Sequence, residues 1–124
     1  MIGVDTNILT RAFLLDDTKQ SADAQKFLKQ NADKENIFIS SYAILEFAWV
    51  LKMKNYTRQQ IYDAIIFLAD TKGITISQRD VVVTAAGKYL LGKADFGNYM
   101  ILADGQLNGA SSLKTFDKKL LQEL

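Results

Sequence analysis

The fold of this chain is decided by the stretch Ile2-Gly3-Val4-Asp5-Thr6-Asn7-Ile8-Leu9. Its first three residues predict a short buried strand, and an apolar pattern of helical period begins at Ile8. Asp5 therefore lies where a strand ends and a helix begins. In open α/β sheets ligands bind at this edge, beyond the carboxyl ends of the strands. An acid at such a junction either caps the helix or holds a cation.

Outward from this stretch, short strands alternate with amphipathic helices, a pattern typical of α/β folds with a mainly parallel sheet. We expect a three-layer α/β/α sandwich that forms a single domain over residues 1–124. Strands are expected at Ile2–Asp5, Asn36–Ile39, Ile74–Ile76 and Ser111–Phe116. Helices are expected at Thr6–Leu15, Gln20–Gln30, Tyr42–Lys54, Arg58–Asp70, Arg79–Leu91 and Phe96–Leu107, with a short one after Asp117.

The composition excludes several kinds of chemistry. Hydrophobic residues make up 48% and charged residues 23%, as in ordinary globular domains. Because the chain has no Cys and no His, disulfides, thiol catalysis, Ser-His-Asp catalysis and most zinc sites are excluded. Sites built from carboxylates alone suit Mg²⁺ or Mn²⁺. The formal net charge of +1 provides no global field that would attract nucleic acid.

We expect a cytoplasmic protein without a membrane segment. No apolar run approaches the roughly 18 residues that a membrane-spanning helix needs. The N-terminus carries no basic leader before its apolar stretch, so a signal peptide is not expected.

Carboxylates stand at similar places in several segments. Asp117, like Asp5, follows an expected strand and precedes an expected helix, so a parallel sheet would place both on one edge. Asp95 and Asn98 are three residues apart and share the first turn of one expected helix. Asp5, Asp95 and Asp117 could equally well serve as caps of helix N-termini, a role worth about 1 kcal/mol each.

Glu46 is harder to explain as a cap, because it interrupts the otherwise apolar run 42–51. We expect that run to be buried on most sides. A buried carboxylate is costly unless it is paired, protonated or bound to a metal, and a salt bridge to a neighbouring Lys or Arg is the simplest alternative to a metal.

Asp5, Glu46, Asp95 and Asp117 come from separated segments, each near the carboxyl end of an expected strand or in the helix that follows it. Like charges brought together repel, so such a site is costly without a cation. Bound Mg²⁺ or Mn²⁺ would offset the repulsion, activate a water and stabilise charge on a phosphate. The pattern predicts metal-dependent hydrolysis of phosphodiesters.

Four short motifs in this order resemble the PIN-domain family, specifically the VapC-like toxins of bacterial and archaeal toxin–antitoxin pairs. The resemblance covers essentially the whole chain. It implies a PIN fold, a Mg²⁺- or Mn²⁺-dependent ribonuclease that cuts RNA, a cognate antitoxin that covers the site, and a homodimer. The motifs are Val4-Asp5-Thr6-Asn7-Ile8-Leu9, Ile44-Leu45-Glu46-Phe47-Ala48-Trp49-Val50-Leu51, Ala94-Asp95-Phe96-Gly97-Asn98-Tyr99 and Thr115-Phe116-Asp117.

One position departs from the family pattern. Many relatives carry two acids in the third motif, whereas here Asn98 holds the position of the usual third catalytic acid. An amide oxygen can bind a metal but adds no negative charge. Three alternatives stay open: Asp95 takes over as ligand, the site binds metal weakly and cuts slowly, or Asn98 is a deliberate inactivating change.

Other polar residues could support the site. The hydroxyls of Thr6 and Thr115 could orient ligands or a metal-bound water, and Asn7 could hydrogen-bond a neighbouring carboxylate; local turn and cap bonding explains them equally well. Basic residues that could hold phosphates, or simply be solvated, are Arg11, Lys93, Lys114, Lys118 and Lys119.

Two other functions remain open from the sequence. The first is a binding or regulatory protein on the same fold, catalytically weakened or disabled by Asn98. The second is a receiver-like or phosphatase-like domain with Asp5 as phosphoryl acceptor, although the chain lacks the second acid beside Asp5 that many such phosphatases have.

The region between Tyr42 and Asp70 is rich in large apolar side chains. Some are expected in the core, and the surplus could form a surface for a dimer partner or an antitoxin helix, although a stripe at helical spacing is more often simply core. They include Phe47, Trp49, Val50, Met53, Tyr56, Ile61, Ile65 and Phe67.

Overall fold

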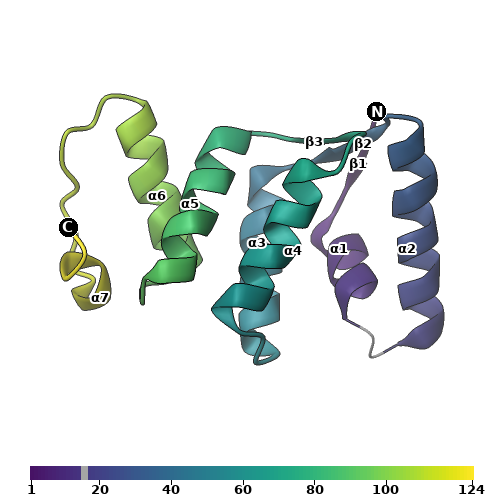
Figure 1. The fold of residues 1–124 in the computed structure, drawn as a ribbon, viewed down its shortest axis with the longest axis horizontal. Helices are drawn as coiled ribbons and strands as arrows, with labels where there is room; N and C mark the ends of the chain where they lie inside the picture. Colours follow the sequence, from purple (N-terminus) through teal and green to yellow (C-terminus); the bar gives the residue numbers. More distant parts are fainter. Residues whose placement is uncertain (15–16) are drawn as a thin grey trace.

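The computed structural model describes residues 1–14 and 17–124 and contains a parallel sheet (Figure 1). The sheet has the order β1-β2-β3, formed by β1 (Ile2–Val4), β2 (Ile37–Ile39) and β3 (Ile74–Ile76). Gly3 pairs with Phe38, and Phe38 pairs with Thr75. The α/β class and the parallel sheet are confirmed.

Seven helices accompany the sheet in the described part of the chain, and most agree closely with the expected ranges. The Thr57 side chain and Gln60 form a capping box that starts the fourth helix where the sequence predicts it. The first helix ends at Phe13 with Leu14 extended, so the expected end at Leu15 is two residues too late; Leu15 itself, like the expected break at Asp16, lies outside the described residues. The helices are α1 (Thr6–Phe13), α2 (Thr18–Asp33), α3 (Ser41–Met53), α4 (Arg58–Asp70), α5 (Arg79–Leu91), α6 (Phe96–Leu107) and α7 (Lys118–Leu121).

The core lies between the sheet and helices α1, α3, α4 and α5. Ile37 and Ile39 of β2 are fully buried, as are Ile44, Phe47 and Leu51 of α3. Alternating apolar residues of the strand and helically spaced residues of α3 thus bury their faces against each other. This packing holds the carboxyl end of β1 and the first turns of α3 in a fixed relation.

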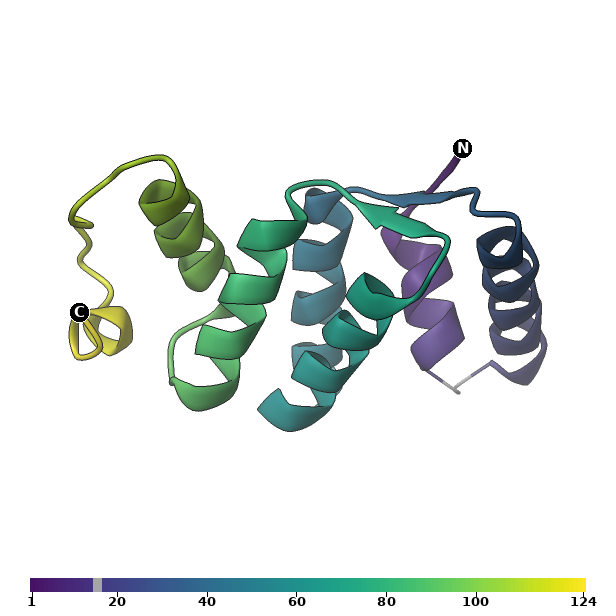
Figure 2. The ribbon, with the colours of Figure 1, turned by 45° about the horizontal axis from the view of Figure 1, so that its top comes forward.

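The expected fourth strand at Ser111–Phe116 is wrong for this structure, since residues 110–117 are irregular. The segment belongs to the end of the chain that packs on α5 and α6: Leu120 of α7 is buried, and Tyr99 of α6 donates a hydrogen bond to Glu123. Figures 1 and 2 show α7 at the end of the molecule opposite α2, with α3 and α5 between it and β1. As a result, one edge of β1 has no strand partner in the described part of the chain.

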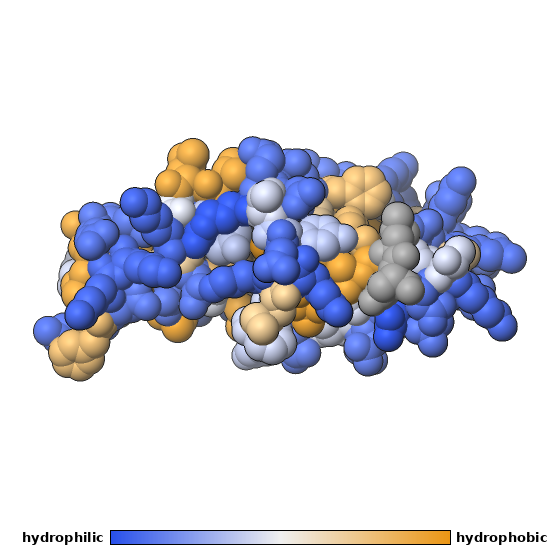
Figure 3. Space-filling view, turned by 90° about the horizontal axis from the view of Figure 1, so that it is seen from below, coloured by the Kyte–Doolittle hydropathy of each residue, from blue (hydrophilic) through white to orange (hydrophobic). Residues whose placement is uncertain are grey.

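Some large apolar side chains remain on the surface. Seen from below, they form separate orange patches among hydrophilic side chains (Figure 3). Of the apolar residues in α3 and α4, Phe47 is buried, whereas Trp49, Met53 and Phe67 are exposed, so some of them are core and a surplus lies on the surface, as expected. No helix among the described residues has the length and apolar character needed to cross a membrane.

Candidate active site

Asp5 caps α1. Its backbone is extended, and its Oδ1 accepts a hydrogen bond from the Ile8 backbone N–H at 3.2 Å. The capping interpretation is therefore confirmed. The carboxylate is exposed, and the cap uses one of its two oxygens, so capping and binding of a cation are compatible.

Glu46 lies beside the start of α1. The Thr6 hydroxyl donates a hydrogen bond to Glu46 Oε2 at 3.1 Å, which joins α1 to α3 next to Asp5. The expected burial of Glu46 is wrong, because its side chain is exposed. It shares one face of α3 with Tyr42 and Trp49, which are four residues before and three after it, and this face is open.

Asn98 and Asp117 form a second pair. The Asn98 amide donates from Nδ2 to Asp117 Oδ2 at 3.3 Å, and Asp117 Oδ1 accepts from the Leu120 backbone N–H at 2.8 Å. The Thr115 hydroxyl accepts from the Asp117 backbone N–H at 3.0 Å, as expected for local turn bonding. Asp117 thus caps α7, and Asn98 holds its other oxygen.

Asp95 is engaged elsewhere. Lys52 Nζ lies 2.5 Å from Asp95 Oδ1, and this hydrogen bond holds the pKa of the Asp95 carboxyl below its usual range. Although Asp95 occupies the N-cap position of α6, its side chain makes no capping hydrogen bond among the described residues, so that interpretation is wrong. The lysine was not expected from the sequence, because nothing in the spacing of α3 and α6 predicts the contact.

A clamp at the C-terminus positions the start of α6. The Tyr99 hydroxyl donates to the Glu123 carboxylate at 2.7 Å and accepts from the Ala94 backbone N–H at 3.1 Å. Burial raises the pKa of the Tyr99 phenol, and the hydrogen bond from Tyr99 lowers the pKa of Glu123. A Cβ at Gly92 would lie 1.9 Å from the Tyr99 hydroxyl oxygen, so this close approach requires glycine.

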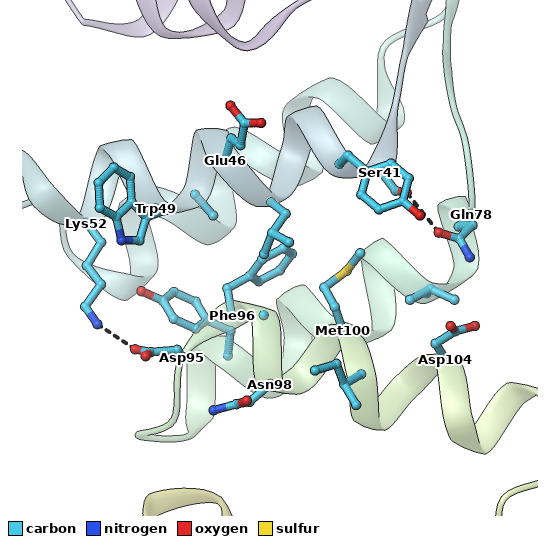
Figure 4. A pocket seen from close by; sticks show the side chains of 17 residues that line it. Ser41, Glu46, Trp49, Lys52, Gln78, Asp95, Phe96, Asn98, Met100 and Asp104 are labelled. Atoms are coloured by element: carbon cyan, nitrogen blue, oxygen red, sulfur yellow. Dashed lines mark hydrogen bonds and ion pairs between the residues drawn. The ribbon is translucent and has the colours of Figure 1, made fainter. Parts of the chain in front are cut away.

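A groove of about 650 Å³ separates α3 from α6. Figure 4 shows Glu46, Trp49 and Lys52 along α3, with Asp95 and Asn98 across the groove on α6. The Glu46 carboxylate points away from Asp95 and Asn98. Apolar parts of the lining come from Tyr42, Leu45, Met100 and Ile101.

The predicted site residues therefore lie in two pairs rather than in one cluster, and Asp95 is in neither pair. Asp5 and Glu46 are linked through Thr6, whereas Asp117 lies with Asn98. Residues 1–14 and 17–124 contain no group of three or more acids close enough to hold a metal ion. The physical reason is the missing fourth strand, which was expected to place Asp117 on the same sheet edge as Asp5.

The remaining candidates lie on the surface of their elements. The Asn7 side chain is exposed, and its backbone carbonyl accepts a hydrogen bond from the Thr10 hydroxyl. Lys114 Nζ lies 5.3 Å from the centre of the Phe116 ring. Lys93, Lys118 and Lys119 are exposed, and Arg11 is partly exposed on α1.

Comparison with known proteins identifies the family. Neither a curated protein nor a solved structure matched the chain. The model of one protein family, the PIN domain, matches residues 2–123. Since this match spans nearly the whole chain, the protein belongs to the PIN domain family.

Proposed function

We propose that this protein is a metal-dependent endoribonuclease that hydrolyses RNA phosphodiesters. PIN domains are a family of metal-dependent nucleases, and the family match supports nuclease activity in general. The observation that carries the proposal is the hydrogen bond from Thr6 that holds the Glu46 carboxylate next to Asp5, because it sets two acids from different elements at the carboxyl end of β1. Carboxylates that lie close together repel each other, so this arrangement suits a bound cation.

The donor atoms fit Mg²⁺ or Mn²⁺. Asp5, Glu46 and Asp117 offer carboxylate oxygens and Asn98 offers an amide oxygen, which are the hard ligands that these ions prefer. When bound there, the ion would activate a water and stabilise the charge that develops on the phosphate. Thr6 orients Glu46, and Asn98 orients Asp117.

We infer that the full site assembles when residues 111–116 pair with the free edge of β1. Asp5 follows β1 directly, and Asp117 follows residues 111–116 directly. A parallel register that sets Thr115 beside Gly3 therefore brings Asp117 next to Asp5. The free edge of β1 can accept such a strand, because the edge of a sheet presents backbone N–H and C=O groups that are not paired with another strand.

Asn98 is the better candidate than Asp95 for the third ligand. Asn98 already contacts Asp117, whereas the Asp95 carboxylate is held by Lys52. To bind a cation beside Asp117, the Asn98 amide would rotate so that its oxygen takes the place of Nδ2. An uncharged third ligand predicts weaker metal binding and slower cleavage than an acid would give.

The toxin role is a finer part of the proposal. The motifs around Asp5, Glu46 and Asp117 resemble those of VapC-like toxins, which supports a cognate antitoxin, a homodimer and a cytoplasmic location. Copurification of the chain with the product of a short reading frame next to its gene would test this role.

The test of the activity is RNA cleavage with Mg²⁺ or Mn²⁺, measured beside calorimetric metal binding, for the native chain, Asn98→Asp and Glu46→Gln. We expect metal-dependent cleavage that Asn98→Asp increases and Glu46→Gln abolishes. If neither the native chain nor Asn98→Asp binds metal or cuts RNA, the nuclease proposal is wrong. RNA binding without cleavage in both forms would instead support the alternative of a regulatory binding protein.

A further inference from the structure

Two exposed aromatic side chains flank Glu46 on the same face of α3. Tyr42 precedes Glu46 by four residues and Trp49 follows it by three, so all three lie on one stripe of the helix. The Tyr42 side chain is 77% exposed and Trp49 is 62% exposed, although both are large and apolar. All three line the groove between α3 and α6.

We propose that Tyr42 and Trp49 are stacking platforms for the bases of single-stranded RNA on either side of Glu46. This inference rests on the proposed nuclease function and names how its substrate is held. With a rise of about 1.5 Å per residue, the Cα atoms of Tyr42 and Trp49 lie about 6 Å and about 4.5 Å along the helix axis from that of Glu46, on opposite sides of it. Bases on both sides of the phosphate nearest Glu46 would each meet a ring.

Single-stranded RNA is the substrate class that this arrangement fits. Aromatic side chains stack on unpaired bases, whereas the bases of a duplex are already stacked on one another. Exposed rings that bind bases through their faces tolerate any sequence, because every base has such a face. Lys52 lines the same groove beside Trp49, but its ammonium is paired with Asp95, so the two rings rather than this charge carry the binding.

A protein partner fits this surface less well. Glu46 lies between Tyr42 and Trp49, so a helix or second copy seated on both rings would cover the carboxylate. The groove is also lined by Lys52, Asp95 and Asp104, and charged residues are depleted from the cores of protein interfaces. A nucleotide chain stacks its bases on the two rings, and a divalent cation between its phosphate and Glu46 would offset the repulsion between these two anions.

Trp49 provides a direct readout, because it is the chain's single tryptophan. A short mixed-sequence RNA is added to the full chain at low salt with Ca²⁺ as the divalent cation, and binding is followed both by Trp49 fluorescence and by anisotropy of a dye on the RNA. We expect the single strand to quench Trp49 and a duplex of the same sequence to leave it unchanged.

The variants Tyr42→Leu and Trp49→Leu keep an apolar side chain but remove the ring. We expect each to weaken the binding of single-stranded RNA about tenfold. Trp49→Phe, which keeps an aromatic ring, should retain most of the native affinity. Phe67→Leu is the matched control, since Phe67 is 63% exposed on α4 and does not line this groove. It should bind as the native chain does.

Several outcomes separate this inference from the nuclease proposal. If RNA binds and quenches Trp49 but is never cut with Mg²⁺ or Mn²⁺, the stacking inference stands and the nuclease proposal fails. If both leucine variants bind RNA like the native chain, the stacking inference fails even when cleavage is observed. It also fails if Trp49→Leu changes the oligomeric state in size-exclusion chromatography and leaves RNA binding intact, because the rings would then serve a second copy.

Discussion

At the residue scale, Asp5 caps α1 and, under the proposed function, would also hold a cation, two roles that the sequence leaves as alternatives. One oxygen accepts from the Ile8 backbone N–H, and the neighbouring Thr6 hydroxyl donates to Glu46. Because asparagine caps a helix as well as aspartate does but lacks its charge, substitution can separate the roles.

We expect Asp5→Asn to keep the unfolding free energy of the native chain within about 0.5 kcal/mol. Cleavage should fall at least about 100-fold, because changing a group that only supports a metal ligand already lowers activity about 10–100-fold. Asp5→Ala should lose the same activity and, in addition, about 1 kcal/mol of unfolding free energy. Urea unfolding and RNA cleavage assays check both. Native-like cleavage by Asp5→Asn would show that Asp5 is a cap only.

Asn98 decides the charge of the site. In Asn98→Asp, a carboxylate replaces the amide that donates to Asp117 at 3.3 Å, so two negative groups face each other. We expect this variant to be about 1–2 kcal/mol less stable than the native chain in EDTA. Mn²⁺ should restore its stability more than that of the native chain. Thermal unfolding with and without Mn²⁺ measures this; equal metal stabilisation of both forms would argue against Asn98 as a ligand position.

At the element scale, α7 depends on the clamp rather than on its own length. A helix of four residues is too short to be stable alone, and α7 is held by buried Leu120 and by the bond between Tyr99 and Glu123. The same Tyr99 hydroxyl accepts a second hydrogen bond, from the Ala94 backbone N–H, and so holds the turn that precedes α6. The clamp therefore positions Asn98 and Asp117 together.

We expect Tyr99→Phe to lower the unfolding free energy by about 1–3 kcal/mol, because it leaves the buried Ala94 N–H without its acceptor. Chemical denaturation at neutral pH measures the loss. Tyr62→Phe, on the partly exposed face of α4, is a matched control and should change the stability little. A loss below about 0.5 kcal/mol for Tyr99→Phe would show that the clamp is dispensable.

The clamp also predicts a pH dependence. The hydrogen bond from Tyr99 holds the folded pKa of Glu123 below its ordinary value of 4.5, so the unfolded chain binds more protons in that range. Stability from this group is therefore present above pH 4.5 and declines as the pH falls through the folded pKa. Glu123→Gln should make unfolding less dependent on pH in this acid range. An unchanged acid dependence of the midpoint would contradict the assignment.

At the scale of the whole molecule, the position of residues 111–116 decides whether the site is complete. In this structure the segment lies far from β1, across α3 and α5 (Figure 1). Closure onto β1 would convert two pairs of oxygen donors into one site. Under the proposed function, a divalent cation would bind the assembled form better than the open one and should therefore favour closure.

Closure can be trapped, because the chain has no native cysteine. In the proposed register Ile2 lies beside Lys114, so Ile2→Cys with Lys114→Cys should form a disulfide within one chain, faster with Mn²⁺. Ile2→Cys with Gln106→Cys is the out-of-register control. Non-reducing gels show the product. Disulfides only between chains would mean that a second copy completes the sheet, and no disulfide would refute the closure.

Local features were predictable from the sequence to different degrees. The bounds of α4, β3, α5 and α6 agree with expectation, because caps, glycines and apolar periodicity act within a few residues. The capping roles of Asp5 and Asp117 follow from the same local rules. Glu46 was misjudged, because an apolar run around it does not reveal which face of α3 is covered.

The class of fold, the family motifs and a candidate site with only oxygen ligands could all be predicted from the sequence. Each depends on residue types or on patterns within a few residues, and these are the same in the unfolded and the folded chain. Only the tertiary structure decided that Thr6 holds Glu46, that Lys52 takes Asp95, and that Asn98 pairs with Asp117. These contacts join residues far apart in the chain. Their geometry depends on how the helices pack and on whether a further strand pairs with the edge of β1.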